Sequence, residues 1–215
     1  MPPNDAEARV RRNPEETRRR ILDAATDEFA RHGFEGGRID RIARSASANQ
    51  RMIYHYFGDK AGLYVAVLEQ ALSQLRMEEM KLDMDAMAAD EGLLQLFDFI
   101  SGHFEGHPEL VKLLSGENLL EAAYLKRSDA TPVISSPLLG LIEGLLARGG
   151  ADGSIRTGLD PLHLYVTMVA LSYFHLSNGA TLSVIFDTDL ARPDWRRDHR
   201  AMARAMLRAY LLPKD

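Results

Sequence analysis

Residues 38–60 constrain this chain more than any other segment, because they predict two short amphipathic helices joined by a tight turn. Ile39 and Ile42 repeat at helical spacing before the turn. Ile53 and Phe57 do the same after it. Helices this short bury too little apolar surface to be stable alone. The pattern therefore requires at least one further helix and a larger body on which both can rest.

The preceding segment predicts that further helix over residues 13–32. Asn13, Pro14 and Glu16 combine a side-chain cap, a proline in the first turn and a carboxylate three residues after the cap. Gly33 is expected to end the helix. The positions expected to be buried are Ile21, Leu22, Ala25 and Phe29.

The rest of the chain keeps the same helical spacing of apolar residues, and no segment alternates convincingly with period two. We therefore expect an all-α protein of about nine helices. A fourth helix begins after Asp59, whose side chain can cap it, and runs towards Met84. Glycine and proline breaks separate the others. These are expected at about residues 91–106, 108–125, 136–148, 160–178 and 194–212.

Composition excludes several classes of protein. The 215 residues contain no cysteine, which rules out disulfides, thiolate catalysis and cysteine-ligated zinc. The longest apolar stretch, residues 162–176, is shorter than the roughly 20 residues needed to cross a bilayer. The first residues also lack the cationic start and apolar run of an export signal. We expect a cytoplasmic protein with no membrane partner.

Charge is distributed unevenly. The net charge of −5 argues against a protein that coats nucleic acid indiscriminately. Residues 1–60 nevertheless carry 12 Lys and Arg against 10 Asp and Glu, whereas residues 61–215 carry 14 against 21. The basic end of the chain coincides with the two short helices. Residues 1–12 are expected to form a flexible basic arm before them.

Four motifs follow one another in the first third of the chain. They are ILDAA at residues 21–25, FARHGF at 29–34, Ile42 with Ala43, and IYHYFGDKAGL at 53–63. In this order they resemble the N-terminal DNA-binding domain of the tetracycline-repressor (TetR) family. The resemblance implies an all-α homodimer whose two domains differ in role. A three-helix DNA-binding domain with a helix-turn-helix, residues 13–60, precedes an effector-binding and dimerisation domain, residues 61–215.

Two places depart from the family's usual pattern. Ser47 stands where the turn usually has glycine, so we expect a left-handed or nearby backbone conformation that costs about 1 kcal/mol. Gly37 and Arg38 stand where small hydroxyl residues usually open the second helix and contact phosphate. Arg38 can offer a phosphate contact of its own.

The second short helix carries groups that suit DNA. A helix in the major groove presents three or four outward side chains to base edges. Gln50 can pair with adenine and Arg51 with guanine. The resemblance implies that Tyr54 and His55 hold the sugar-phosphate backbone and that Lys60 binds phosphate. The full set of candidate DNA contacts is Thr17, Arg38, Asn49, Gln50, Arg51, Tyr54, His55, Tyr56 and Lys60.

The last two expected helices predict a homodimer. The helix at residues 160–178 is apolar on nearly all sides, so it needs cover from a partner as well as from its own domain. Two subunits would hold two recognition helices about one DNA turn, roughly 34–36 Å, apart. This spacing fits double-stranded DNA with a palindromic operator.

An effector pocket is expected among the helices of the second domain. Methionines give an adaptable lining, aromatic residues give walls, and polar groups orient the ligand. We expect a small-molecule effector that releases a repressor from its operator, and no cofactor. The candidate ligand-binding residues are Met80, Met84, Phe97, His103, Phe104, Asn118, Glu121, Tyr124, Tyr165, Phe174 and Asn178.

Two other functions compete with a DNA-binding regulator. His103 and His107 have a spacing that suits one metal ion on a helical face. Gly106 and Pro108 break that helix, however, and no third ligand is evident. A metal-dependent enzyme is therefore disfavoured, and neither a metal site nor a catalytic site is expected. A helical interaction protein that does not bind DNA is disfavoured by the exposed groups of the second short helix.

Arginines recur at every fourth position of the last expected helix, at residues 196, 200, 204 and 208. This arginine stripe is a second basic surface that DNA could contact. No base-reading side chains accompany it, so we favour a solvent-facing stripe paired with acidic neighbours.

Overall fold

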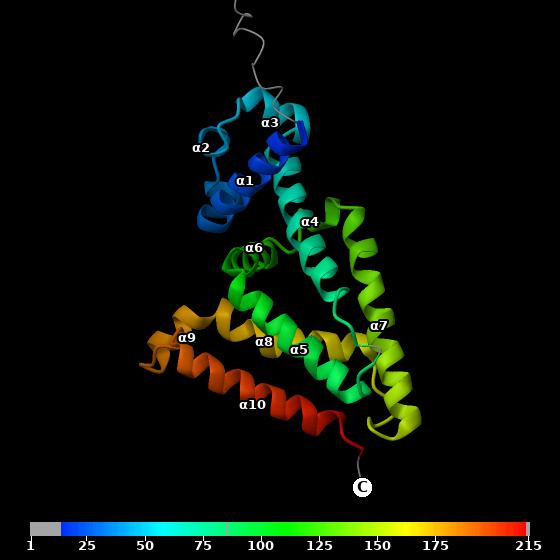
Figure 1. Ribbon diagram of the computed structural model, residues 1–215. Helices are drawn as coiled ribbons and strands as arrows, with labels where there is room; N and C mark the ends of the chain where they lie inside the picture. Colours follow the sequence, from blue (N-terminus) through cyan, green and yellow to red (C-terminus); the bar gives the residue numbers. More distant parts are fainter. Residues whose placement is uncertain (1–13, 85, 214–215) are drawn as a thin grey trace, which may run out of the picture. The chain divides into compact units, whose positions relative to one another are not determined.

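The computed structural model describes residues 14–84 and 86–213, with the backbone alone for residues 131–136 (Figure 1). Every regular element in these residues is helical, which confirms the predicted all-α class. The chain forms two compact units, divided between Val67 and Leu68. The basic arm expected at residues 1–12 and the cap expected at Asn13 lie outside the described residues.

The first unit contains α1 (Pro14–Gly36), α2 (Ile39–Ser45), α3 (Gln50–Phe57) and the first part of α4 (Lys60–Glu79). The expected core positions of α1 are all buried, which confirms that stripe. Its members are Ile21, Leu22, Ala25 and Phe29.

The junction between α3 and α4 depends on a glycine and a cap. The carboxylate of Asp59 accepts a hydrogen bond from the Gly62 N–H at 2.7 Å, which confirms Asp59 as the cap of α4. A Cβ atom added to Gly62 would lie 2.1 Å from the carbonyl oxygen of Phe57, inside van der Waals contact. Only glycine lets α4 begin this close to the end of α3.

The second unit comprises the rest of α4 and α5 (Ala89–Gly106), α6 (Pro108–Leu119), η1 (Leu125–Arg127), α7 (Ala130–Asp152), α8 (Pro161–Ser177), α9 (Gly179–Ile185) and α10 (Pro193–Leu211). Helix α5 lies at its centre and packs against α7, α8 and α10 (Figure 1). Leu93, Leu96, Phe97 and Ile100 on α5 are fully buried in this core.

Several predicted helix limits need correction. Helix α1 breaks at Gly33 (φ 65°), as predicted, but short helical structure resumes as far as Gly36. Helix α4 ends at Glu79 instead of reaching Met84, and α7 begins six residues early, at Ala130. The described residues form ten α-helices, one more than the nine expected, and the additional helix is α9. Its seven residues are too few for a clear periodic pattern.

Helix α6 is shorter than the predicted 108–125, and a buried carboxylate explains why. One carboxylate oxygen of Glu117 accepts hydrogen bonds from the N–H groups of Tyr124 and Leu125 at 2.7 and 2.8 Å. Glu121 and Ala122 adopt left-handed backbone conformations with φ of 54° and 58°. The chain therefore turns back onto the end of α6 instead of extending it.

None of the helices in the described part of the chain combines the length and apolar character that crossing a membrane requires.

Candidate DNA-binding site

The turn between α2 and α3 is held by backbone and side-chain hydrogen bonds. Ser47 has φ of 49°, which confirms the left-handed conformation expected there. The N–H of Ala48 donates to the carbonyl of Ala43 at 2.9 Å. Arg20 of α1 donates to the carbonyl oxygen of Ala46 at 3.1 Å. These bonds fix where α3 begins relative to α1 and α2.

An ion pair joins α1 to α2. The guanidinium of Arg41 lies 2.5 Å from the carboxylate of Glu28, which also accepts the backbone N–H of Arg38 at 2.9 Å. Burial alone would raise the pKa of Glu28, but the hydrogen bonds from Arg41 and Arg38 outweigh it and lower that pKa. Glu28 therefore remains a charged acceptor that holds the start of α2.

Helix α3 presents the predicted reading side chains together on its exposed face. Asn49 caps the helix by accepting the N–H of Arg51 at 2.9 Å, which confirms the predicted cap. Gln50, Arg51 and Tyr54 are exposed, and 47% of Tyr54 is accessible although its ring is large and apolar. Ile53 on the opposite face is fully buried. The helix is thus fixed by one face and free to contact a groove with the other.

The flanking candidates have other partners in this structure. Lys60 donates to the carbonyl oxygen of Glu35 at 3.2 Å and lies 4.7 Å from the ring centre of Phe34. The guanidinium of Arg38 is paired with Asp40 at 3.0 Å. A phosphate would therefore exchange with these weak, exposed contacts. His55 is exposed beside them, and the Tyr56 ring is half-buried against its neighbours.

Thr17 requires a correction. Its side chain is only 1% exposed, and its hydroxyl lies 3.4 Å from the Arg20 guanidinium. The expected contact between this hydroxyl and phosphate is at odds with that burial. The sequence placed Thr17 in the first turn of α1 but did not show which way the helix faces its neighbours.

Many of the expected effector-binding residues do not lie together in the second unit. Met84, Phe97 and Phe104 are part of its apolar core. Met80 and Phe174 are 48% and 58% exposed. Among the remaining candidates, His103 is buried, Tyr124, Tyr165 and Asn178 are half-buried, and Asn118 and Glu121 are exposed.

One predicted residue, Tyr165, belongs to a buried polar cluster. Arg76 of α4 donates to its hydroxyl and lies over its ring at 5.0 Å. Arg76 also pairs with Glu79, whose side chain is completely buried, at 2.5 Å. Burial raises the pKa of Glu79 to about 7, although the charge of Arg76 opposes that rise. Local sequence did not distinguish Arg76 and Glu79 from the other charged residues in the last turn of α4.

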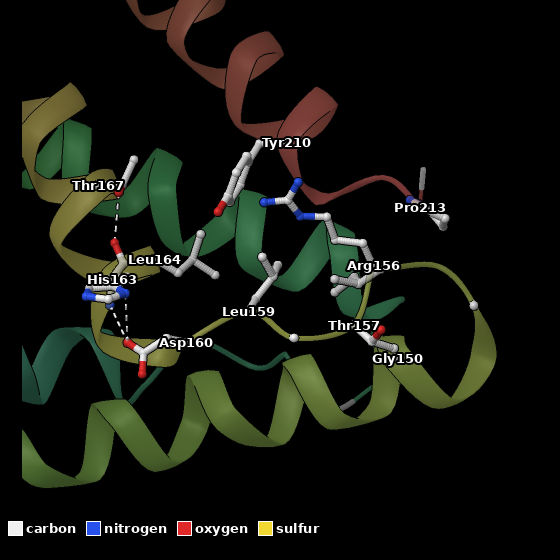
Figure 2. Close-up of a pocket in the computed structure, with 13 residues that line it drawn as sticks. Gly150, Arg156, Thr157, Leu159, Asp160, His163, Leu164, Thr167, Tyr210 and Pro213 are labelled. Atoms are coloured by element: carbon white, nitrogen blue, oxygen red, sulfur yellow. Dashed lines mark hydrogen bonds and ion pairs between the residues drawn. The ribbon is translucent and has the colours of Figure 1, made fainter. Parts of the chain in front are cut away.

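A cavity of about 630 Å³ lies between the ends of α7 and α10 and the start of α8 (Figure 2). Arg156 and Tyr210 both line it and contact each other, with the guanidinium over the ring at 3.6 Å from the ring centre. Asp160 caps α8 at its rim by accepting the N–H of His163 at 2.7 Å. None of the predicted effector-binding residues lines this cavity. Its lining includes Gly150 and Gly153 at the end of α7, which continues to Asp152 and so past the predicted end at about residue 148.

The arginine stripe of α10 is paired with acidic side chains, as predicted. Arg204 donates to Asp98 at 2.8 Å, and its pKa is raised chiefly by that hydrogen bond. Arg208 lies 2.5 Å from Glu91, and Arg200 lies 2.5 Å from Glu105. These pairs confirm the predicted acidic partners, but the three arginines are half-buried against α5 and do not face solvent freely.

An apolar surface remains exposed on α8 and α10. Six of its large side chains are each between 48% and 58% accessible. They are Leu162, Val166 and Phe174 on α8 and Met202, Met206 and Tyr210 on α10. Helix α9 adds Val184, Ile185 and Phe186, which are between 66% and 82% accessible. So much exposed apolar surface is typical of an interface.

Two family descriptions match this chain. Residues 21–67 match "Bacterial regulatory proteins, tetR family", and residues 90–207 match "Tetracyclin repressor-like, C-terminal domain". The matched ranges contain α2, α3 and most of the second unit. They agree with the two-unit organisation of the structure.

Similar proteins regulate transcription. The repressor NicS of Pseudomonas putida is 36% identical over 183 residues, covering 83% of this chain and 86% of NicS. The regulator RutR of Escherichia coli is 29% identical over 168 residues, covering 74% of this chain and 73% of RutR. Among solved structures, a transcriptional regulator of Streptomyces coelicolor, SCO4942, has a TM-score of 0.68 and 25% identity, covering 91% of this chain and 98% of its own. FadR of Bacillus subtilis, solved with stearoyl-CoA, has a TM-score of 0.66 and 18% identity, covering 90% of this chain and 99% of its own.

Proposed function

This chain belongs to the tetracycline-repressor family of DNA-binding transcriptional regulators, and we propose that it is a homodimeric repressor released from a palindromic operator by a small-molecule effector. The observation that carries the DNA-binding part is the exposed face of α3. Gln50, Arg51 and Tyr54 are accessible together on a helix whose opposite face is anchored by Ile53. A helix held in this way suits the major groove.

We assign different tasks to these side chains. Arg51 reads a guanine and Gln50 an adenine, each pair contributing roughly 1–3 kcal/mol of discrimination. Tyr54, His55 and Lys60 bind the sugar-phosphate backbone of the DNA and set the register of α3 on it. Phosphate contacts of this second kind strengthen binding to all sequences alike.

The proposed dimer uses the exposed apolar surface of α8 and α10. Leu162, Val166 and Phe174 on α8 would be covered by the same helix of a second copy, since a two-fold interface joins identical surfaces. A single recognition helix reads too few base pairs for useful specificity. Dimerisation therefore supplies the second half-site.

The proposed effector site includes Tyr165 and its buried partners. Arg76 and Glu79 are two ionisable groups in an apolar surrounding, an arrangement that can orient a polar ligand. Both oxygens of Glu79 lack a hydrogen-bond partner of good geometry. FadR of Bacillus subtilis was solved with stearoyl-CoA, but its 18% identity supports only a shared fold.

Selection from a pool of random DNA duplexes tests the DNA-binding part. We expect the full chain to enrich a palindrome whose half-sites are about one helical turn apart. Arg51→Ala should lose preference at one base pair of each half-site. Tyr54→Ala and Lys60→Ala should weaken binding to all duplexes, and Lys60→Ala should lower the salt slope by about 1.

Arg197→Ala is the matched control, because Arg197 is an exposed arginine on α10 whose ion pair within the described part of the chain is with its neighbour Asp198. It should leave selection and affinity unchanged. Enrichment of no sequence, or equal loss on all sequences for Arg51→Ala, would contradict the proposed reading of bases. Mass spectrometry of small molecules that leave the purified protein when operator is added tests the effector part.

A further inference from the structure

Two histidines meet where α5 ends and α6 begins. His103 is in the last turn of α5, and His107 is the residue between the helices. Their ring centres are 4.2 Å apart and their planes differ by 30°. The sequence suggested that the helix break at Gly106 would separate the two imidazoles. In the structure the two rings nevertheless lie side by side.

A carboxylate from another helix completes the group. Oε2 of Glu78, in the last turn of α4, lies 3.1 Å from Nδ1 of His103 although the two residues are 25 positions apart in the chain. One ligand atom from each of Glu78, His103 and His107 can be chosen so that all three lie within 4.8 Å of one another. The sequence offered no third ligand because Glu78 comes from a distant segment.

We propose that Glu78, His103 and His107 form a binding site for a divalent transition-metal ion. Metal bonds to nitrogen and oxygen are about 2.0–2.2 Å long, so two ligands of one ion lie at most about 4.4 Å apart. The ligand atoms lie within 4.8 Å of one another, so side-chain movements of less than about 1 Å would bring them within that limit. The side chains of Glu78 and His107 are each 35% exposed, which leaves them room to move.

The surroundings of the site match what such ions require. The side chain of His103 is only 3% exposed, so the packing around it fixes the position of its ring. Glu109 lies 2.9 Å from Nδ1 of His107. A carboxylate in this position commonly orients a metal-bound imidazole. Glu109 would hold the ring while the ion binds its other nitrogen.

The donor set narrows the choice of ion. Two imidazoles and one carboxylate suit Zn²⁺, Ni²⁺, Co²⁺ or Fe²⁺ better than Mg²⁺ or Ca²⁺, which prefer oxygen ligands. A bound ion would join the last turn of α4 to the junction of α5 and α6. All three ligands belong to the second unit. The proposed metal site can therefore be tested independently of operator binding.

Zinc titration of the full chain, free of any histidine tag and stripped with a chelator, tests the proposal. Calorimetry should give one Zn²⁺ per subunit and a rise in the melting temperature, because a ligand of the native state stabilises it. Glu78→Gln and His107→Ala should each weaken zinc binding by at least about tenfold. His163→Ala is the control, because His163 also lies near a carboxylate, 3.8 Å from Asp160, but is in no group of three ligands among the described residues.

Cobalt provides a second readout that does not depend on stability. Co²⁺ bound by nitrogen and oxygen should give visible absorption bands that His107→Ala abolishes and His163→Ala retains. Circular dichroism of each variant establishes that it is folded. The proposal is overturned if zinc does not bind at micromolar concentration, or if folded Glu78→Gln and His107→Ala bind it as tightly as the unaltered chain.

Discussion

Arg20 of α1 donates a hydrogen bond to the carbonyl oxygen of Ala46, 26 residues later in the chain, at 3.1 Å. Ala46 begins the turn between α2 and α3, and the next residue, Ser47, has a left-handed backbone. The first helix of the unit thus holds the turn that aims the recognition helix. A side chain outside α3 can therefore control how α3 is positioned.

Replacing Arg20 should weaken both the fold of the first unit and operator binding. We expect Arg20→Met to cost about 1.5–3 kcal/mol in the free energy of unfolding, since a charged hydrogen bond to a partly buried carbonyl is lost. Arg19→Met is the matched change, because the contact that Arg19 makes in the described residues, with Asp23 at 3.4 Å, is exposed. Urea unfolding and fluorescence anisotropy with operator DNA measure the two effects. Equal behaviour of both variants would show that the Arg20 contact has no structural role.

Gly62→Ala should disrupt the junction between α3 and α4. The added Cβ would lie 2.1 Å from the carbonyl oxygen of Phe57, so one of the two helices must shift. We expect a loss of several kcal/mol, on the order of a severe packing defect. Gly102→Ala on α5 is the control, because, apart from its chain neighbours and the surrounding helix backbone, no atom of the described residues lies within 4 Å of the new atom. In thermal unfolding, the melting temperature of Gly62→Ala should therefore be clearly lower than that of Gly102→Ala. A near-native melting temperature for Gly62→Ala would be inconsistent with this geometry.

Glu79 should make stability depend on pH. Its folded pKa of about 7 lies above the ordinary 4.5, because burial disfavours the carboxylate more than Arg76 favours it. The folded state then holds a proton that the unfolded state releases, so stability falls as pH rises from 4.5 to 7. Glu79→Gln removes this loss. The advantage of the variant over the unaltered chain should grow by on the order of 3 kcal/mol across that range.

Urea unfolding of both proteins at several pH values between 4.5 and 8 measures this difference. His175 also makes stability depend on pH, between about 4 and 6.5, because burial and then the charge of His199 lower its folded pKa from 6.5 to about 4. It is present in both proteins, so its contribution cancels. A difference that shrinks with rising pH would mean that the ion pair with Arg76 outweighs burial and lowers the pKa of Glu79.

A charge in the apolar surface of α8 should separate the proposed dimer. Phe174→Glu places a carboxylate where a second copy would bury an aromatic ring that is 58% exposed in the single chain. We expect dissociation to increase at least tenfold, since an uncompensated charge in an interface costs several kcal/mol. Leu119→Glu on α6 alters a side chain that is 86% exposed and should have no effect. Analytical ultracentrifugation distinguishes the two, and unchanged dimerisation of Phe174→Glu would place the interface elsewhere.

Much of the first unit was predictable because its signals are local. The buried stripe of α1, the cap at Asn49 and the left-handed Ser47 depend on residues within a few positions of one another. The family motifs also lie in this short segment. Thr17 is the exception, because its burial depends on Arg20 and on how α1 faces the other helices.

In the second unit, sequence periodicity located most helices but could not show which side chains meet. The periodic pattern marked α5, α8 and α10, and the acidic partners of the arginine stripe were expected without being identified. Arg204 and Asp98 are 106 residues apart, and Arg76 and Tyr165 are 89 apart. Such pairs depend on how helices pack, which is determined by the shapes of many side chains together.

The amino-acid sequence by itself determined the helical class, the recognition helix and the family, because spacing, caps and turns act over a few residues. Only the tertiary structure decided that Glu78 joins His103 and His107, that Glu79 is buried beside Arg76, and that Glu117 ends α6. These contacts arise when separate helices pack together and bring chemically suited groups within a few ångströms. Local helix propensity does not determine those distances.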